Sequence, residues 1–499
     1  MTVDAAMQAW SQGRVDDCLA QLRALGAGAA DQPLALQLWA LATASKGKRA
    51  DALALLERAA RIAPSDAQAH FNLAVSLQAI EEITRAISHY QQALRIEPAH
   101  TGALNNLSDL YRRRGRAPEG WALMARYQAA DGAMVGLEIR MAKLAMDLRR
   151  FDEAATWFDR AEQHAPGDAS VGWEHAMLDL VREDFAAGWP RYERRLESYG
   201  FNGLGIHPYA APRWTGEPIA GKRLLIHREQ GLGDAIMFAT AFQGLIDDGA
   251  HLHLALAPPL ARLMAFNFPK ARVWSSVTTT GPAARQPEQR WLAVAGPIDI
   301  QAPVCSLGVL RLMNGPPKPR AYLRADPVDI AIWAERLQAL SPKAPRARRI
   351  GLVLGTRQVR WNDDGQTQAI RKTLPAGLAA PLADVKRAQW VALHDRETAS
   401  MLADVPSLDI VDPSPWITDM ADTAAIIASL DLVVSADTGV AHLAAAMGKP
   451  VILMLWWNAD WRWGVDRADS YWYPNVKVIR QPAPGDWTSV VEAVVKELA

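Results

Sequence analysis

The first two hundred residues of this 499-residue chain repeat with a fixed period. Pro64, Pro98 and Pro166 share one register, with Gly132 in the missing slot, and the period is about 34 residues. A small residue precedes each of these positions at constant spacing: Ala52, Ala86, Gly120 and Ala154. The pattern predicts units of two helices that meet where only a small side chain fits. Such units must stack, because one unit cannot bury its own apolar face.

Turn residues and apolar spacing support the same units. Leu73, Leu77, Ile87, Tyr90 and Leu94 recur at helical intervals. The turns between helices are marked by Gly13-Arg14, Gly47-Lys48, Gly115-Arg116 and then Arg149-Arg150, without glycine. This register resembles tetratricopeptide repeats. The resemblance implies an α-solenoid of about five units over residues 1–200, with degenerate first and last units.

A tetratricopeptide array commonly binds a peptide on its concave face, which is lined by the first helix of each unit. Four polar residues are expected on first helices, where they could hold an extended protein segment: Asn72, Asn105, Asn106 and Asp109. Two other interpretations stay open. These side chains are simply solvated, or the array only forms a homodimer or supports the next domain.

Bulk composition excludes some partners. Lys and Arg total 54, as do Asp and Glu, so neither nucleic acid nor an anionic membrane is expected as a partner. The two cysteines, Cys18 and Cys305, are far apart, which favours a reducing cytoplasm over a disulfide framework. The first residues do not resemble a signal peptide, and no apolar run has the length of a membrane span.

Strand and helix patterns alternate after residue 200, which predicts parallel α/β structure. Predicted strands of a first half are Arg223–His227, Leu252–Ala257, Ala271–Trp274 and Trp291–Ala295, with a helix over Ala235–Ile246. Those of a second half are Ile350–Leu354, Gln389–Leu393, Leu408–Val411, Leu432–Ser435 and Val451–Leu455. Gly315–Arg320 separates the halves. We therefore expect two Rossmann-like domains, 210–325 and 345–484, and a C-terminal helix within 485–499.

Two strand-to-helix junctions could carry chemistry. Asp437-Thr438-Gly439 follows an apolar strand and opens a helix, so Asp437 or Thr438 can cap it and the free N–H groups suit a phosphate. The stretch Arg228–Ile236 has Gly231 and Gly233, which permit close backbone approach. Asp234 caps the following helix or acts in catalysis, and both interpretations stay open.

The two junctions together resemble the ADP-heptose heptosyltransferases, which have a GT-B fold. The match is closer to bacterial proteins that fuse tetratricopeptide repeats to such a module. Three stretches carry this closer resemblance: Glu229–Asp234, Asp419–Ala424, and Asp460–Trp463 with Ser470–Pro474 and Gly485–Trp487. The resemblance spans nearly all of residues 210–499. It also implies that the terminal helix, Thr488–Leu498, crosses back onto the first half.

The resemblance implies roles for individual residues. Asp234 matches the proposed general base, within an acceptor-side loop that includes Glu229, Gln230, Gly231 and Gly233. Donor nucleotide and phosphate contacts are implied for Asp437, Thr438, Gly439 and His442, with positive charge from Arg371, Lys372 or Arg357. His442 alternatively bonds only a nearby carbonyl. The stretch Gly355–Ile370 departs from the family pattern and leaves the donor open.

The implied reaction is metal-independent, inverting transfer from a nucleotide sugar to a Ser or Thr hydroxyl of a protein. Asp363-Asp364 could bind a cation, although a solvated loop is the other reading. Some members of this class glycosylate flagellin with nonulosonic acids such as pseudaminic acid. Flagellin and a CMP-linked nonulosonic acid are therefore the candidate acceptor and donor. The alternatives are a lipid-linked or polysaccharide acceptor, or a non-catalytic interaction protein.

Several tryptophans cluster near the C-terminus, where they either stack on a base or sugar or pack the C-terminal segment. They are Trp456, Trp457, Trp461, Trp463, Trp472 and Trp487.

Overall fold

The chain forms two compact units, Met1–His164 and Ala165–Ala499. The computed structural model describes all residues except 1, 27, 29, 30, 126–134, 199–205, 207, 208, 277–290, 343–346, 356–370, 395–404, 406, 407 and 459. The division falls before the last helical pair, whereas the sequence places the end of the repeat array near residue 200. The reason is physical, because that pair packs onto the α/β region of the second unit.

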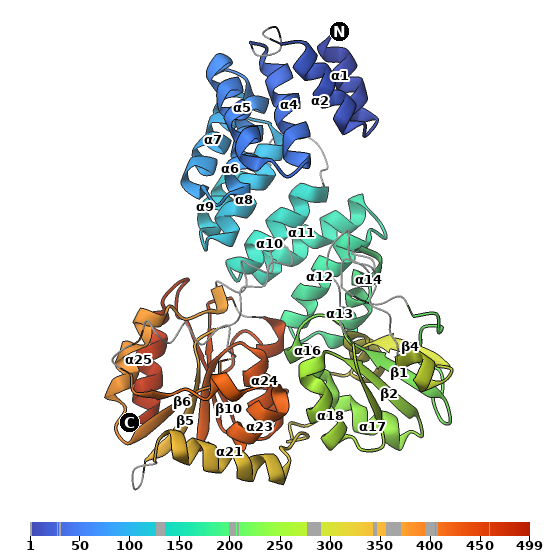
Figure 1. The fold of residues 1–499 in the computed structure, drawn as a ribbon, viewed down its shortest axis with the longest axis vertical. Helices are drawn as coiled ribbons and strands as arrows, with labels where there is room; N and C mark the ends of the chain where they lie inside the picture. The colour runs from blue at the N-terminus through green and yellow to red at the C-terminus, as the bar shows by residue number, and fades with distance from the viewer. Residues whose placement is uncertain are drawn as a thin grey trace. The chain divides into compact units, whose positions relative to one another are not determined.

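The first unit consists of helical hairpins, drawn in blue to cyan in Figure 1. They are α1 (Val3–Ser11) with α2 (Val15–Ala24), α4 (Pro33–Ser45) with α5 (Arg49–Ile62), α6 (Ala67–Ala79) with α7 (Ile83–Ile96), α8 (Thr101–Arg113) with α9 (Ala117–Ala125), and α10 (Val135–Asp147) with α11 (Phe151–His164). Each hairpin also packs on the next, as expected for a tetratricopeptide solenoid.

The residues that repeat in the sequence lie at helix ends, at a helix crossing and in turns of the array. Pro64 and Pro98 follow the ends of α5 and α7, where proline cannot continue a helix. A Cβ atom at Gly120 would lie 2.9 Å from Cδ2 of Leu144, so the helices cross closely here and a side chain would require Leu144 to shift. Arg149 takes the place of a turn glycine and adopts the same left-handed backbone, with φ of 59°.

The four residues predicted to face a peptide are mostly engaged inside the array. Asn72 donates to Oε1 of Gln37 at 2.8 Å, and Asn106 donates to the Tyr90 hydroxyl at 3.2 Å. Asn105 lies half-buried on α8 beside Asn106. Peptide binding by Asn72, Asn105 and Asn106 stays a prediction.

Asp109 on α8 is the shared ion-pair partner of several arginines rather than a solvated polar side chain. It is buried and forms ion pairs with Arg112, Arg113 and Arg140, the first at 3.1 Å. Burial alone would raise the pKa of Asp109, but Arg140, Arg112 and Arg113 outweigh it and lower the pKa to about 2. Asp109 therefore holds α8 to α10.

We predict that Asp109→Asn destabilises the repeat array by roughly 2–3 kcal/mol, because three guanidinium groups lose their shared counter-charge. The melting temperature in thermal unfolding measures this loss. The control is Asp16→Asn, since the Asp16 side chain is 83% exposed and pairs only with Lys46 at the surface. Equal melting temperatures for Asp109→Asn and the wild type would contradict the assignment.

The second unit begins with a helical segment, α12 (Ala169–Val181), α13 (Phe185–Tyr192) and the short α14 (Arg195–Ser198). A four-stranded parallel sheet follows in the order β3-β2-β1-β4. Its strands are β1 (Arg223–His227), β2 (His251–Leu256), β3 (Arg272–Ser275) and β4 (Ile300–Pro303). Its helices are α16 (Leu232–Phe238), α17 (Phe242–Asp247), α18 (Ala261–Asn267), α19 (Trp291–Ala295) and α20 (Leu307–Arg311). We call this the acceptor half, after the role that the resemblance implies for it.

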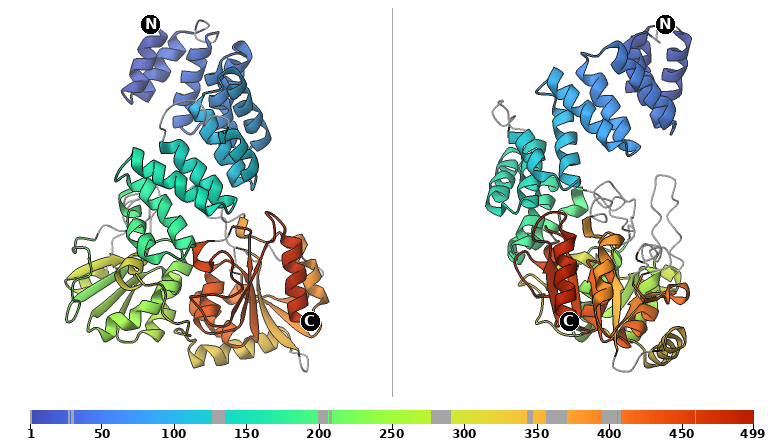
Figure 2. Two further views of the ribbon diagram at one scale, coloured as in Figure 1. Left: turned by 180° about the vertical axis from the view of Figure 1, so that it is seen from behind. Right: turned by 90° about the vertical axis from the view of Figure 1, so that its left-hand side faces the viewer.

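Helix α21 (Pro327–Leu340) leads into a second parallel sheet of order β10-β9-β8-β5-β6-β7. Its strands are β5 (Arg348–Val353), β6 (Ala388–Ala392), β7 (Ile410–Val411), β8 (Leu432–Ala436), β9 (Val451–Leu455) and β10 (Val476–Arg480). Helices α23 (Met420–Ala428) and α24 (Gly439–Ala446) cover one face and α25 (Trp487–Leu498) the other, as both figures show (Figure 1, Figure 2). We call this the donor half, again after the role that the resemblance implies for it.

Two predicted elements are wrong. Trp291–Ala295 forms helix α19, and the strand of this region is β4, because a short apolar run fits either conformation. Helix α25 buries Trp487, Val490 and Val494 in the donor-half core instead of crossing back onto the first half. Strand β10 was not predicted.

Candidate active site

The two predicted junctions meet in space. Helix α16 starts after β1 and α24 starts after β8, and the two helices pack against each other within the second unit (Figure 1). A Cβ atom at Gly233 would lie 2.8 Å from Cδ2 of His442, and one at Gly439 would lie 3.5 Å from the Gly233 nitrogen. Glycine at position 233 therefore lets the two halves approach closely, whereas a Cβ atom at position 439 would make an ordinary van der Waals contact.

Asp234 has two simultaneous roles at the start of α16. Its Oδ2 accepts from the Gly231 N–H at 3.0 Å, which caps the helix. Its Oδ1 forms an ion pair with Arg462, which belongs to the donor half. The side chain stays 13% exposed, and each carboxylate oxygen has a second lone pair. Capping and chemistry are therefore compatible for this residue.

Thr438, not Asp437, caps α24, by accepting from the Ala441 N–H at 3.4 Å. Asp437 instead accepts from Nε1 of Trp463 at 2.8 Å and pairs with Nζ of Lys372 at 2.6 Å. Burial alone would raise the pKa of Asp437, but the Lys372 ammonium group outweighs it, and the pKa falls to about 2. Asp437 is thus a firmly ionised partner that fixes Lys372 beside the α24 N-terminus.

Five largely buried charges, with side chains 6–17% exposed, form one connected chain across the junction. Lys372 also lies 3.8 Å from Asp460, and Asp460 pairs with Arg462 at 2.6 Å. The chain thus runs from Asp437 through Lys372, Asp460 and Arg462 to Asp234. Burying such charges costs several kcal/mol each unless every charge is paired. Asp460 and Arg462 were missed as site residues, although their Asp-Trp-Arg-Trp motif was part of the resemblance.

His442 is buried and uncharged near neutral pH. Its Nδ1 forms a hydrogen bond of 2.7 Å with the Tyr473 hydroxyl, so the predicted bond to a carbonyl is replaced by one to a phenol. Burial lowers the pKa of His442 to about 4 against the opposing effect of Asp437. His442 therefore contributes packing against Gly233 and a neutral imidazole, not a positive charge.

The remaining predicted residues lie as follows. The Arg371 guanidinium is 5.2 Å from the Trp456 ring centroid at the carboxyl end of β9. Glu229 is buried and paired with Arg195, so it does not face solvent. Gln230 has a left-handed backbone, with φ of 56°. Arg357 and Asp363-Asp364 lie outside the described residues.

Most of the C-terminal tryptophans pack the structure. Four of them are buried: Trp461, Trp463, Trp472 and Trp487. Trp461 and Trp472 pack edge to face, and Trp463 packs against His442. Of the two explanations, core packing is therefore correct for these four. Trp456 and Trp457 are half-buried at the carboxyl edge of the second sheet.

Comparison with known proteins matches both parts of the chain. Residues 416–455, which include α23 and the Asp437–His442 junction, match the family model described as Glycosyltransferase family 9 (heptosyltransferase). Residues 67–100 match the tetratricopeptide repeat. The chain combines tetratricopeptide repeats with a glycosyltransferase family 9 domain.

Similar proteins include Protein FlbA of Caulobacter vibrioides, 24% identical over 458 residues, which are 87% of this chain and 73% of that protein. Cellulose synthase operon protein C of Xanthomonas axonopodis pv. citri is 32% identical over 160 residues, 30% of this chain and 10% of that protein.

Solved structures similar to this chain include two bacterial proteins. One is the C-terminal part of a TPR repeat-containing protein from Cytophaga hutchinsonii, at 12% identity, covering 41% of this chain and 81% of that one, with a TM-score of 0.35. The other is PilF of Pseudomonas aeruginosa, at 15% identity, covering 40% and 90%, also with a TM-score of 0.35. At these scores neither supports a conclusion.

Among the described residues, no helix combines the length and apolarity needed to cross a bilayer.

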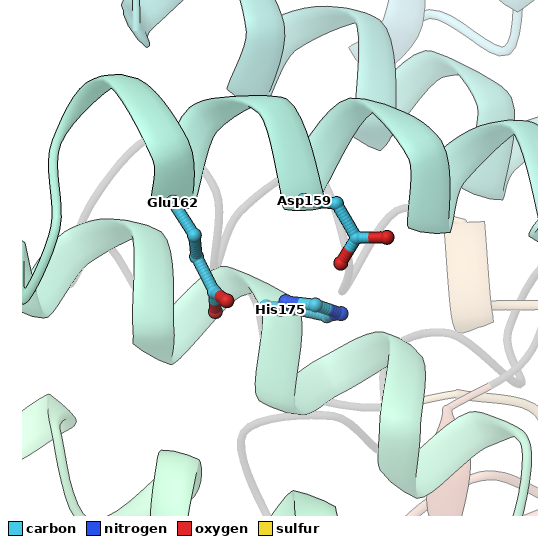
Figure 3. Close-up of side chains that lie close together, drawn as sticks. All are labelled: Asp159, Glu162 and His175. Atoms are coloured by element: carbon cyan, nitrogen blue, oxygen red, sulfur yellow. The ribbon is translucent and has the colours of Figure 1, made fainter.

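No metal site is assigned to the acidic side chains Asp159 and Glu162, which extend from the same side of α11 (Figure 3). They belong to the first unit, whereas His175 belongs to the second. Acidic pairs one helical turn apart are common on exposed helix faces.

We predict that the family 9 domain loses stability on acidification because of His442. Below pH 6.5 the unfolded chain protonates this histidine, whereas the folded chain resists until about pH 4. The contribution of His442 to the free energy of unfolding is thus fully present above pH 6.5. It falls by about 2 kcal/mol from pH 7 to pH 5. His442→Asn should remove that part of the pH dependence in denaturant unfolding, whereas His251→Asn, at an exposed position, should retain it. Equal pH dependence in both variants would contradict the buried neutral state.

Proposed function

We propose that the α/β region is a GT-B glycosyltransferase that moves a sugar from a nucleotide sugar to a Ser or Thr hydroxyl of a protein. The observation that carries the proposal is the pairing of two junctions. A partly exposed carboxylate, Asp234, lies at one helix start, and a fixed cation, Lys372, lies beside the start of the other. Glycosyl transfer needs both a proton acceptor and a stabiliser of the departing phosphate.

In this proposal Asp234 is the general base. It accepts the proton of the acceptor hydroxyl through Oδ1 while Oδ2 keeps the bond to the Gly231 N–H. The acceptor oxygen then attacks the anomeric carbon, and the bond from that carbon to the phosphate oxygen breaks. A single displacement of this kind inverts the anomeric configuration.

The departing phosphate receives the electron pair of the broken bond. Lys372 and the N–H groups of Thr438 and Gly439 at the start of α24 are proposed to stabilise it, with Arg371 close by. Asp437 is ionised and paired, so it orients Lys372 rather than touching the phosphate. Fixed protein cations in this position support a metal-independent reaction.

We propose that the tetratricopeptide repeats recruit the acceptor protein, with flagellin as the candidate. A CMP-linked nonulosonic acid such as pseudaminic acid is the candidate donor. Tetratricopeptide arrays commonly bind polypeptides, which favours a protein acceptor over a lipid-linked or polysaccharide one. Cys18 and Cys305 are both buried free thiols, which favours a reducing cytoplasm as the location.

We predict that Asp234→Asn lowers the rate of transfer at least about 100-fold, because asparagine cannot accept the hydroxyl proton. Donor binding should stay nearly intact. The measurement is the initial rate of sugar transfer to purified flagellin from CMP-pseudaminic acid, read by intact mass. Asp247→Asn is the matched control, at the exposed end of α17. Wild-type turnover by Asp234→Asn would remove the assignment of the base.

A second prediction tests the donor side alone. CMP at one hundred times its dissociation constant should stabilise the protein by about 2.7 kcal/mol. Lys372→Met should lose most of this stabilisation relative to its own ligand-free baseline, since the fixed cation is gone. Lys386→Met, at an exposed position of the same half, should keep it. A wild type that no nucleotide stabilises would favour the non-catalytic alternative.

A further inference from the structure

A fully buried ion pair joins the helical segment α12–α14 to the loop that precedes Asp234. The side chains of Arg195 and Glu229 are both 0% exposed. Arg195 donates to the two carboxylate oxygens of Glu229 at 2.5 and 2.8 Å, and also to the Ser306 hydroxyl at 3.1 Å. Its Nη1 donates to the Tyr192 carbonyl at 3.0 Å. A buried pair of this quality fixes geometry more than it adds stability.

A second contact from the helical segment, made by Tyr192, holds Gln230, the residue after Glu229 in the same loop. Gln230 holds a left-handed backbone, which is unusual for a side chain of this kind. Its Nε2 donates to the Tyr192 hydroxyl at 2.8 Å. The following residue, Gly231, donates its N–H to Asp234. Consecutive residues thus connect Arg195 and Tyr192 to the carboxylate of Asp234.

The same helical segment also contacts the donor-half stretch that carries Arg462. Trp189 and Tyr192 pack edge to face on Trp461, with ring centroids 5.3 and 6.3 Å apart. The Arg462 guanidinium stacks over the Trp461 ring, 4.4 Å from its centroid. The same guanidinium pairs with Asp234. Asp234 is therefore held through its loop and through its ion-pair partner by one helix end.

We infer that Arg195 and Tyr192 are positioning residues for Asp234, supplied by the helical segment α12–α14 at the start of the second unit. They fix the Glu229–Gly231 loop, which sets the direction of the carboxylate toward the acceptor hydroxyl. This inference rests on the proposed role of Asp234 as the base. It makes α12–α14 part of the catalytic machinery rather than a connection between repeats and enzyme.

A purely structural role predicts something different. If the ion pair only attached the helical segment to the α/β region, its loss would lower stability, and transfer would fall only with the folded fraction. Positioning predicts slower transfer by a protein that remains folded and still binds nucleotide. A catalytic group displaced by about 1 Å can cost up to 100-fold in rate.

Tyr192→Phe is the sharpest test, because it removes only the hydroxyl that holds Gln230 and keeps the aromatic contacts. We expect the Gly231 amide to exchange with deuterium about tenfold faster. Transfer from CMP-pseudaminic acid to flagellin should fall about tenfold, with an unchanged melting temperature and unchanged stabilisation by CMP. The matched control is Arg467→Gln, which breaks the 3.1 Å ion pair between Arg467 and Glu183 and leaves the loop untouched.

A double variant provides a second test in case Tyr192→Phe lowers the melting temperature. Replacing Arg195 and Glu229 together by methionine removes both members of the buried pair. Glu193, which also pairs with Arg195 at 2.6 Å, keeps its 2.7 Å pair with Arg213, so the fold should persist. Transfer should again fall while the melting temperature holds. Unchanged Gly231 exchange or wild-type transfer in both variants would overturn the inference. Exchange needs neither donor nor acceptor, so its result is separate from any failure of the transferase assignment, which Asp234→Asn tests.

Discussion

The second unit depends on one electrostatic constraint: five charges, each largely buried, are held where its two α/β halves meet. Each of them would be too costly to bury alone, so each requires an opposite charge within hydrogen-bonding distance. Lys372 and Asp437 come from the donor half, as do Asp460 and Arg462, and Asp234 comes from the acceptor half. The ion pair between Arg462 and Asp234 therefore sets how closely the two helix starts approach.

Close approach in turn explains the glycine at position 233. Gly439 lies against the backbone at Gly233, and a Cβ atom at position 233 would lie 2.8 Å from the His442 ring, so a side chain there would push the ring away. The neutral imidazole of His442 completes this packing without adding a charge that the chain could not balance. Packing and charge thus place a carboxylate and an ammonium group together, which is the arrangement that glycosyl transfer requires.

Local patterns predicted much of the fold. The register of Pro64 and Pro98 predicted units of two helices, which the structure contains, and Val451–Leu455 is a strand with the predicted bounds. Both follow from neighbours in sequence. Side-chain pairing was not predictable in the same way. Glu229 looked like a loop acid, yet its partner Arg195 lies 34 residues earlier and buries it. Trp291–Ala295 became a helix because five apolar residues carry no period of their own.

The central claim is that the donor phosphate binds between Lys372 and the start of α24, with its sugar facing residue 234. A crystal structure of the Asp234→Asn variant with CMP-pseudaminic acid tests this most directly. We predict a phosphate oxygen within hydrogen-bonding distance of Nζ of Lys372 and of the Thr438 or Gly439 N–H, and an anomeric carbon that faces Asn at position 234. A nucleotide bound elsewhere in the second unit, with the Lys372–Asp437 pair untouched, would contradict the account.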